Sequence, residues 1–230
     1  MKEKNTQAAE KLKREKRIKK IIKLILLVLI LLLLAIYFIS GIIYNNGNFS
    51  ITLDKNLYFE KNIIIYDNVN YKVYQSELYA NAIDSFDNIS YKWLPNDLDN
   101  HDGSHNGENY IAYTFYMENI GNDVSDVWSE IIIDDVIKDI DEAVRIRVYK
   151  NGVPTTYAKI SGRGVPEEGT VPFESDTLVK RDHVENFGPG DKIKYTIVLW
   201  LEGSDPECVE NILGGEIKIH MEFNSEFIGK

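Results

Sequence analysis

The start of the chain divides sharply into a charged segment and an apolar one. From Leu24 to Tyr44 the sequence runs for 21 residues without a charge, and most of these residues are Leu or Ile. A helix of that length rises about 31 Å at 1.5 Å per residue, which matches the hydrocarbon core of a bilayer. Leu and Ile side chains also favour insertion individually. The pattern predicts a transmembrane helix over residues 24–44.

Positive charge gathers on one side of this apolar segment. The residues just before it include eight cations: Lys11, Lys13, Arg14, Lys16, Arg17, Lys19, Lys20 and Lys23. The linker that follows it, residues 45–49, carries no charge. Because Lys and Arg flanks stay in the cytoplasm, we expect a single-pass protein of the cell membrane. Residues 1–23 would form its cytoplasmic tail, and the C-terminal domain would be extracellular.

A cleaved signal peptide is the alternative to a permanent anchor. Such peptides have apolar regions of about 7–15 residues, followed by small residues at the cleavage site. The run here is longer, and its end, Phe38–Ile43, has no A-x-A-like pair. We therefore expect an uncleaved signal-anchor, with cleavage near Ser40–Tyr44 as the alternative.

Beyond the linker, apolar and polar residues alternate with the period of a β-strand. In Lys192–Glu202 one face is apolar, and Val198 and Trp200 add apolar side chains to the other, so we expect burial on both faces. Asn151-Gly152 predicts a hairpin turn, because both residues tolerate positive φ. The other predicted strands are Ser50–Leu53, Leu57–Tyr66, Tyr71–Leu78, Ile89–Trp93, Tyr110–Glu118, Val144–Val148 and Glu216–Phe223.

Helical patterns are few in this part of the chain. Apolar spacing predicts a short helix over Asp134–Ala143, and an Asp-Pro start with a Gly214-Gly215 end predicts another over Asp205–Leu213. Gly162–Pro172 and Pro95–Glu108 have the composition of loops. Many strands in one compact unit indicate an all-β fold. We expect residues 50–230 to form an antiparallel, jelly-roll-like β-sandwich with one or two short helices.

Charge is distributed unevenly between the two parts. Ten of the 26 Lys and Arg residues and three of the 36 acidic residues lie within residues 1–44, which leaves sixteen basic and thirty-three acidic residues and a net charge of −17 beyond them. This balance disfavours nucleic acid as a partner and favours cations or basic surfaces. The alternative is that the acidic residues keep an exported domain soluble. Cys208 is the sole cysteine, so the chain has no internal disulfide.

One predicted loop concentrates possible metal ligands. Its four carboxylates and two imidazoles are Asp97, Asp99, His101, Asp102, His105 and Glu108. Carboxylate oxygens suit Ca²⁺, and imidazole nitrogens suit softer cations. The spacing departs from the EF-hand rule, which requires Asp or Asn at the position of His101 and Gly at that of Asp102. A solvated connection is the alternative interpretation of this loop.

Catalytic motifs are not found in the sequence. It has no H-E-x-x-H, G-x-S-x-G or P-loop pattern. A sortase-like enzyme needs a thiolate supported by a His and a downstream Arg, but no Arg follows Arg181. Glu207 and Glu210 flank Cys208, and their charge is expected to raise the pKa of its thiol. We expect a protein without enzymatic activity.

Two blocks of the outer domain resemble bacterial surface sandwiches of the TasA and camelysin kind. In the first block, Tyr110–Gly152, a strand ends at Asn119-Ile120-Gly121 and a second strand leads to Asn151-Gly152. The second block consists of Tyr195–Gly203, Asp205-Pro206-Glu207-Cys208 and a last strand that ends at Met221-Glu222-Phe223. The likeness covers about half of the outer domain.

The resemblance implies jelly-roll domains exported by low-GC Gram-positive bacteria, several of which build the extracellular fibres of a biofilm matrix. Assembly in that family resembles donor-strand exchange, in which an N-terminal strand completes a neighbour's sheet. By this analogy the assembly strand is Phe49, Ser50, Ile51, Thr52 and Leu53. Family members are released by a signal peptidase, whereas an intact anchor would hold this domain at the membrane. The protease activity that the name camelysin implies is not carried over, because H-E-x-x-H is missing.

These patterns predict a membrane-anchored structural or adhesive protein of the bacterial cell surface, or a subunit of the matrix-fibre type. The expected partners are the membrane, an envelope or matrix protein, or a second copy of the chain. The alternative function is a cation- or ligand-binding ectodomain of a membrane assembly that uses the loop Asp97–Glu108.

Overall fold

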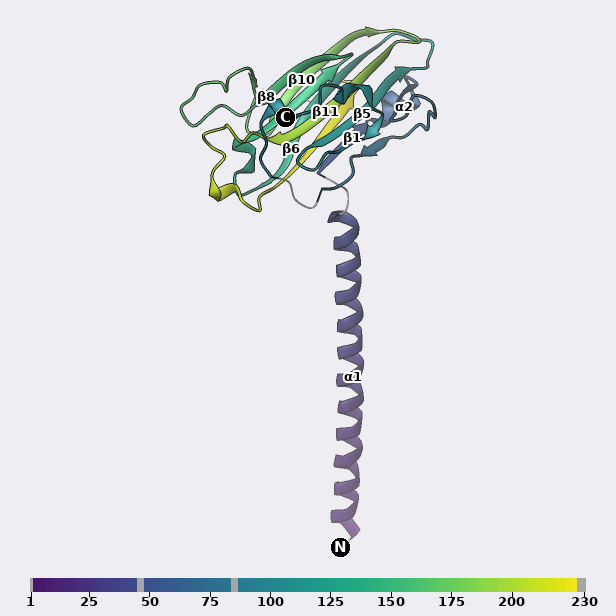
Figure 1. Cartoon of the computed structure of the whole chain (residues 1–230). Helices are drawn as coiled ribbons and strands as arrows, with labels where there is room; N and C mark the ends of the chain where they lie inside the picture. The colour runs from purple at the N-terminus through teal and green to yellow at the C-terminus, as the bar shows by residue number, and fades with distance from the viewer. Residues whose placement is uncertain (1, 45–47, 84–86, 227–230) are drawn as a thin grey trace. The chain divides into compact units, whose positions relative to one another are not determined.

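A computed structural model describes residues 2–44, 48–83 and 87–226 of the 230-residue chain. The chain divides into two units, Met1–Asn45 and Asn46–Lys230. The first unit is the helix α1, Lys2–Tyr44 (Figure 1). Its segment Lys16–Phe38, 23 residues, is long and apolar enough to cross a membrane. The predicted apolar helix is therefore confirmed, and the basic tail continues the same helix toward the N-terminus.

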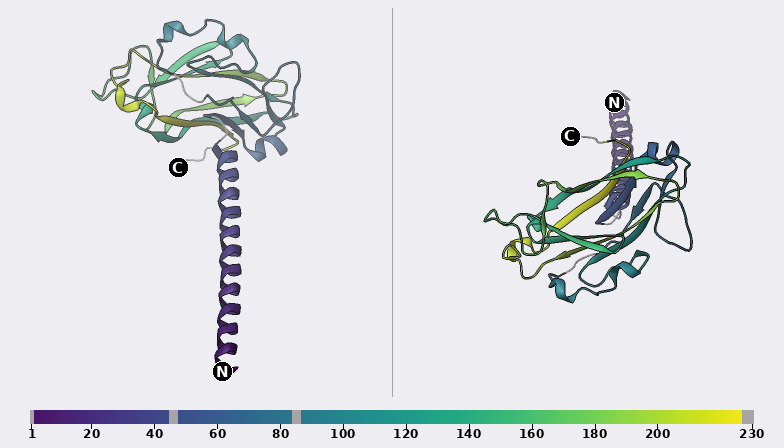
Figure 2. Two further views of the ribbon diagram at one scale, coloured as in Figure 1. Left: turned by 60° about the horizontal axis from the view of Figure 1, so that its bottom comes forward. Right: turned by 90° about the horizontal axis from the view of Figure 1, so that it is seen from above.

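Two β-sheets make up the second unit (Figure 1, Figure 2). Sheet A has the order β10-β6-β12-β1-β3; its strands are β1 (Phe49–Leu53), β3 (Glu77–Tyr79), β6 (Ser125–Ile137), β10 (Leu178–Phe187) and β12 (Glu216–Asn224). Sheet B has the order β2-β5-β11-β7-β8-β9, with β4 paired to β5; its strands are β2 (Ile63–Tyr66), β4 (Gly103–Ser104), β5 (Ile111–Asn119), β7 (Val144–Lys150), β8 (Val153–Ala158), β9 (Val171–Pro172) and β11 (Lys192–Leu201). The short helices are α2 (Lys55–Phe59), η1 (Tyr91–Trp93), η2 (Leu98–Asn100), η3 (Ile140–Glu142) and η4 (Glu210–Ile212).

The main core lies between the two sheets and is built from alternate residues of their strands. Phe115 of β5 and Tyr195 of β11 stack with their ring centroids 5.3 Å apart. Phe223 of β12 meets both rings from sheet A, at centroid distances of 5.9 and 5.6 Å. All three side chains are at most 1% exposed, and full burial of such a ring stabilises the fold by roughly 2–3 kcal/mol. This aromatic contact holds the sheets face to face.

The sheets are mixed, whereas the sequence predicted antiparallel ones. Strand β1 runs parallel to β12, with Phe49 opposite Ile219 and Leu53 opposite Phe223, and antiparallel to β3. Strand β9 also runs parallel to its neighbour, β8. Alternation of buried and exposed residues fixes which face of a strand is buried but not its direction. The broader prediction of an all-β domain with a few short helices is confirmed.

The predicted helix over Asp134–Ala143 is wrong. Strand β6 continues through this region and pairs with β12 until Ile137, opposite Glu216. The chain then reverses at Lys138 and Asp139, whose φ angles are 60° and 53°, and the short turn η3 follows. Pairing along β12 gives each strand residue a hydrogen-bonded neighbour, and this outweighs a weak local helical spacing.

Other predicted elements are shorter or different in the structure. The predicted strand Leu57–Tyr66 divides into α2 and β2, because the Asp54 side chain caps α2 by accepting a hydrogen bond from the backbone N–H of Asn56 at 2.8 Å. Three further predicted elements are shorter than expected. Tyr71–Leu78 forms a strand only where β3 begins, and Ile89–Trp93 forms one bridge and the turn η1. Asp205–Leu213 is helical only in η4.

The predicted hairpin at Asn151-Gly152 is confirmed. The two residues have φ angles of 51° and 83°, which a two-residue type I′ turn requires and which Asn and Gly tolerate best. They join β7 to β8, which pair from Lys150 and Val153 onward.

Asn119 organises the turn between β5 and β6. Its buried side chain donates through Nδ2 to the carbonyl oxygens of Asp123, at 3.0 Å, and Phe187, at 2.8 Å. Its Oδ1 accepts from the backbone N–H of Gly121 at 2.9 Å. A Cβ at Gly121 would lie 2.7 Å from the Lys61 carbonyl oxygen, so glycine is needed there. The Asn-x-Gly pattern is therefore the signature of a turn that a buried asparagine holds in place.

Replacing Asn119 by alanine should lower the free energy of unfolding by about 2–4 kcal/mol, because three backbone groups lose their partner and one of them, the Phe187 carbonyl, is buried. Asn122 is exposed in the same turn, so Asn122→Ala is the matched control and should change stability by less than about 0.5 kcal/mol. Urea denaturation measures the free energy of unfolding of both variants. Equal stabilities would contradict the role given to Asn119.

Candidate functional site

The predicted metal loop Asp97–Glu108 lies against sheet B, and two of its four carboxylates have protein partners there. Asp102 accepts a hydrogen bond from the Tyr116 hydroxyl at 2.6 Å. Asp99 Oδ2 lies 3.7 Å from Lys194 Nζ. These contacts tie the loop to β5 and β11.

The two histidines of this loop pack on each other, with ring centroids 5.2 Å apart. His105 Nδ1 lies 2.9 Å from the carbonyl oxygen of Gly103, and burial lowers the pKa of His105. His101 Nε2 lies 3.6 Å from Asp97 Oδ2, and Glu108 is exposed. The structure does not gather the six predicted ligands around one point. Cation binding by this loop stays a prediction.

The predicted assembly strand Phe49–Leu53 is β1, an inner strand of sheet A. Phe49, Ile51 and Leu53 are at most 5% exposed, and β12 and β3 flank the strand on its two sides. Strand β1 therefore completes the sheet of its own chain. Exchange of this strand between copies stays a prediction.

A second, smaller core covers part of the outer face of sheet B. The segment Ile89–Tyr110, termed the covering segment, packs buried Ile89 and Leu94 against Val198 and Trp200 of β11. Strand β11 is thus buried on both faces, as its apolar pattern predicts. On the same face, Arg147 of β7 and Thr156 of β8 are only partly buried.

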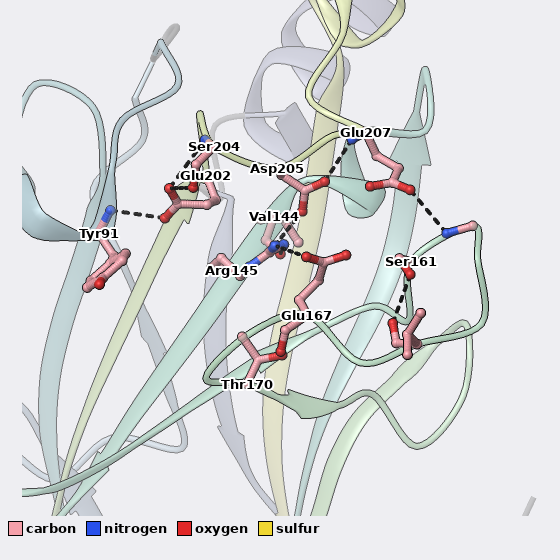
Figure 3. Close-up of polar contacts among 12 residues, drawn as sticks. Tyr91, Val144, Arg145, Ser161, Glu167, Thr170, Glu202, Ser204, Asp205 and Glu207 are labelled. Carbon is pink, nitrogen blue, oxygen red and sulfur yellow. Dashed lines mark hydrogen bonds and ion pairs between the residues drawn. The ribbon is translucent and has the colours of Figure 1, made fainter.

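Next to this cover, Arg145 of β7 is the centre of a buried ionic network (Figure 3). Its side chain is 5% exposed, and Nη2 donates to Asp205, whose side chain is fully buried. The same nitrogen lies 3.5 Å from Glu167 Oε2, and Nη1 donates to the Val144 carbonyl oxygen at 3.3 Å. Asp205 follows β11 and Glu167 belongs to the loop before β9. One guanidinium therefore joins three segments that are distant in the sequence.

Glu207 extends the network toward the surface. Its backbone N–H donates to Asp205 Oδ1 at 2.8 Å, and its Oε1 accepts from the backbone N–H of Gly162 at 3.1 Å. Burial, and after it the contact with the Glu207 carboxyl group, raises the pKa of Asp205, although the hydrogen bond from the Glu207 backbone N–H opposes this shift. The same contact between the two carboxyl groups lowers the pKa of Glu207. Carboxylate oxygens of Glu167, Asp205 and Glu207 lie within 4.8 Å of one another. Arg145 already supplies a positive charge to this cluster, so its geometry is that of a structural ion network.

Glu202 fixes the start of the covering segment. It is 5% exposed, and its Oε2 accepts from the backbone N–H of Tyr91 at 2.9 Å and from Trp200 Nε1 at 3.0 Å. Its Oε1 accepts from the Ser204 hydroxyl at 2.7 Å. Burial opposes ionisation, but these hydrogen bonds outweigh it and lower the pKa of Glu202. A charged carboxylate thus positions Tyr91 beside the sheet.

An open groove lies between the covering segment and the loop before β9. It consists of two adjoining hollows of about 700 and 570 Å³, together termed the outer groove. The larger hollow extends to Tyr149 and Pro154, and the smaller one reaches Arg145 and Trp200. Both are lined by Tyr91, Lys92, Arg147, Thr156, Gly169 and Thr170.

Two cations that line the outer groove have no neutralising partner among the residues that the structure describes. Arg147 Nε donates to Thr156 Oγ1 at 2.9 Å, and the guanidinium carbon lies 5.0 Å from the centroid of the Trp200 ring. Lys92 Nζ lies 5.8 Å from the centroid of the Tyr91 ring. Within the described ranges, neither Arg147 nor Lys92 forms an ion pair. Their charges are therefore available to a bound anion.

Cys208 packs half-buried against the main core. Burial, and after it the charge of Asp205, raises the pKa of its thiol. The predicted direction of this shift is confirmed, but its main causes are burial and Asp205, whereas the sequence suggested Glu207 and Glu210. A raised pKa leaves the thiol protonated and weakly nucleophilic.

Sequence reasoning did not identify Arg145, Arg147 or Asp205 as site residues. The two arginines occupy outward positions of the alternating strand Val144–Val148, a pattern that indicates a polar face but no particular partner. Asp205 is 60 positions away from Arg145 in the sequence. The pairing of Arg145 with Asp205 depends on the fold.

The sequence matches no protein-family model, and no curated protein matches it. Among solved structures, a β-glucosidase from Kluyveromyces marxianus in complex with glucose is similar in part, with 11% sequence identity and a TM-score of 0.25. The match covers 72% of this chain and 15% of the β-glucosidase. A likeness this weak carries no argument about fold or function.

Arg145→Met should lower the free energy of unfolding by about 3–5 kcal/mol, because it leaves the buried Asp205 carboxyl without its cation. Arg163 is exposed on the loop that also carries Glu167. Arg163→Met is the matched control and should change stability by less than about 0.5 kcal/mol. Urea denaturation at neutral pH compares the two variants, and equal losses would show that the network does not stabilise the domain.

Glu202 makes stability depend on pH. Its pKa is lower in the folded than in the unfolded chain, so its contribution is full above the unfolded pKa and is lost as pH falls through the folded pKa. Glu202→Gln should therefore cost about 1–3 kcal/mol at pH 7, and the difference from the wild type should shrink below about pH 4. Urea midpoints across this range test it, with exposed Glu210→Gln as the control. A difference that does not vary with pH would refute the assignment.

Proposed function

We propose that this chain is a membrane-anchored, extracellular structural or adhesive protein of a bacterial cell surface. Helix α1 spans the membrane, and the cations that precede the apolar segment keep residues 1–23 in the cytoplasm. The β-domain, a sandwich of jelly-roll type, lies outside the cell. It contacts an envelope or matrix protein, or another copy of itself.

The observation that carries this proposal is the connection between the helix and the β-domain. Helix α1 ends at Tyr44 and β1 begins at Phe49, so a pull on the anchor reaches the domain at an inner strand. Withdrawing β1 would break its pairing with both β12 and β3 and expose Phe49, Ile51 and Leu53. Each of these side chains contributes roughly 2 kcal/mol of burial. Such a junction suits a domain that holds material at the cell surface under load.

The resemblance to TasA and camelysin proteins supports the same class of function. In this proposal an intact anchor keeps the domain tethered as an adhesive module. Removal of the anchor would release a potential fibre subunit, with β1 as the strand that passes to a neighbour. That exchange requires β1 to leave its place between β12 and β3.

Reconstitution of the full chain in lipid vesicles tests the adhesive function. Vesicles that carry the chain should cluster, or should sediment with isolated bacterial cell-wall material, several-fold more than vesicles that carry residues 1–48 alone. Light scattering measures clustering, and a sedimentation assay measures attachment. Full-chain vesicles that neither cluster nor sediment would overturn the proposal.

A ligand-binding ectodomain is the second candidate function, and the outer groove favours it. Arg147 and Lys92 line an open hollow of about 700 Å³, which is within the range of small-ligand sites. A binding domain would use this groove rather than the loop Asp97–Glu108, whose Asp99 and Asp102 already have protein partners.

A further inference from the structure

The charge of the larger hollow of the outer groove is opposite to that of the domain around it. Beyond residue 44 the chain carries sixteen basic and thirty-three acidic residues, yet the charged side chains that line the larger hollow are Lys92 and Arg147. The smaller hollow is mixed in charge, because Glu167, Glu168, Glu202 and Asp205 line it together with the cations. Arg145 is paired there with Asp205, and the Glu202 carboxylate accepts four hydrogen bonds within the protein. The larger hollow is thus a local positive site on an acidic domain.

We propose that the larger hollow of the outer groove binds an anionic glycan, a sugar chain that carries carboxylate or phosphate groups. Its negative groups pair with Arg147 and Lys92, and its sugar rings and hydroxyls contact the tyrosines and threonines of the groove. This inference goes beyond the proposed function, because adhesion through self-association does not require a glycan.

Arg147 is held in position before a ligand arrives. Its Nε donates a hydrogen bond to the Thr156 hydroxyl, and its guanidinium lies over the buried Trp200 ring. These contacts leave the two terminal amino groups as the available donors. A guanidinium presents such a pair in a planar fork that matches two oxygens of a carboxylate or a phosphate. Little side-chain entropy is lost on binding, because the side chain is already ordered.

The neutral lining of the groove suits a sugar chain. Tyr91 is 50% exposed, and its backbone is fixed by Glu202. Tyr149, half-buried against the second core, also lines the larger hollow. Tyrosine offers a flat apolar face together with a hydroxyl, and a sugar ring has the same combination of apolar C–H and polar O–H groups. Thr155, Thr156 and Thr170 add further hydroxyls.

The groove edge is unsuitable for an acidic peptide bound as an added strand. Phe173 N donates to Ala158 O, so the backbone groups of Ala158 face away from β7, and by the two-residue period so do those of Thr156 and Pro154. Proline has no N–H to donate to an added strand. The net negative charge of the domain also disfavours a nucleic acid. A glycan needs neither a regular edge nor a uniformly basic surface.

The test titrates the full chain in lipid nanodiscs with three probes: oligogalacturonate, which carries carboxylates; a glycerol-phosphate oligomer, which carries phosphates; and a neutral malto-oligosaccharide. Isothermal calorimetry should show binding of at least one anionic probe and much weaker binding of the neutral one. The two anionic probes distinguish carboxylate from phosphate as the recognised group. Equal binding of the neutral probe, or binding of none, overturns the proposal.

Two variants connect any binding to the groove. Lys92→Ala and Arg147→Gln should each lower the affinity for the anionic probe by about ten- to hundredfold, because each removes a charge-assisted contact. Lys61→Ala is the matched control, since Lys61 is an exposed lysine at the opposite edge of sheet B, before β2. Lys92 is exposed, so its replacement leaves the fold intact even if Arg147→Gln destabilises it. Unchanged affinity in Lys92→Ala, with the melting temperature also unchanged, refutes the proposed site.

The glycan test and the vesicle test can fail independently. If vesicles cluster without any glycan, and do so equally with the Lys92→Ala variant, but no anionic probe binds, the adhesive function is supported and the glycan proposal is refuted. Conversely, if an anionic probe binds but the vesicles neither cluster nor sediment, the glycan proposal is supported and the adhesive function is refuted.

Discussion

Burial of strand β11 on both faces is the constraint on which the rest of the domain depends. On one face, Tyr195 packs against Phe115 and Phe223 and joins the two sheets. On the other, Val198 and Trp200 need an apolar cover, because exposing both would lose several kcal/mol of burial. The covering segment provides it, and therefore must cross sheet B. The outer groove exists where that cover ends.

Polar groups around Trp200 show how the domain tolerates such a deep second layer. The indole N–H and the turn into η1 both need an acceptor, and Glu202 serves both. Arg145, on the neighbouring strand, is likewise buried and takes its partner from Asp205. A buried charge costs several kcal/mol unless it is paired and hydrogen-bonded. These carboxylates are therefore structural, and their proximity does not by itself indicate catalysis or a metal.

The same reasoning separates Arg147 from Arg145, although both project from β7 on one face. Arg145 is enclosed and paired, whereas Arg147 borders an open hollow and has only Thr156 and the Trp200 ring as partners within the described residues. Lys92 is supplied by the covering segment that Glu202 anchors. The protein thus stabilises one cation internally and presents two others to the groove. A ligand-binding surface and a stable second core arise from one arrangement of β7, β11 and the covering segment.

The amino-acid sequence determined the apolar helix, the alternating strands β5, β7, β11 and β12 and the Asn151-Gly152 turn, because each is encoded by local periodicity or by backbone preferences. Strands β6 and β10, which pair with each other, were not predicted. In β6, Ile131, Ile132 and Ile133 are consecutive and show no alternation, because part of the outer face of sheet A is also shielded from solvent. Only the tertiary structure decided the parallel direction of β1, the pairing of Arg145 with Asp205 and the groove around Arg147. Those features depend on contacts between residues far apart in the chain, which local patterns do not record.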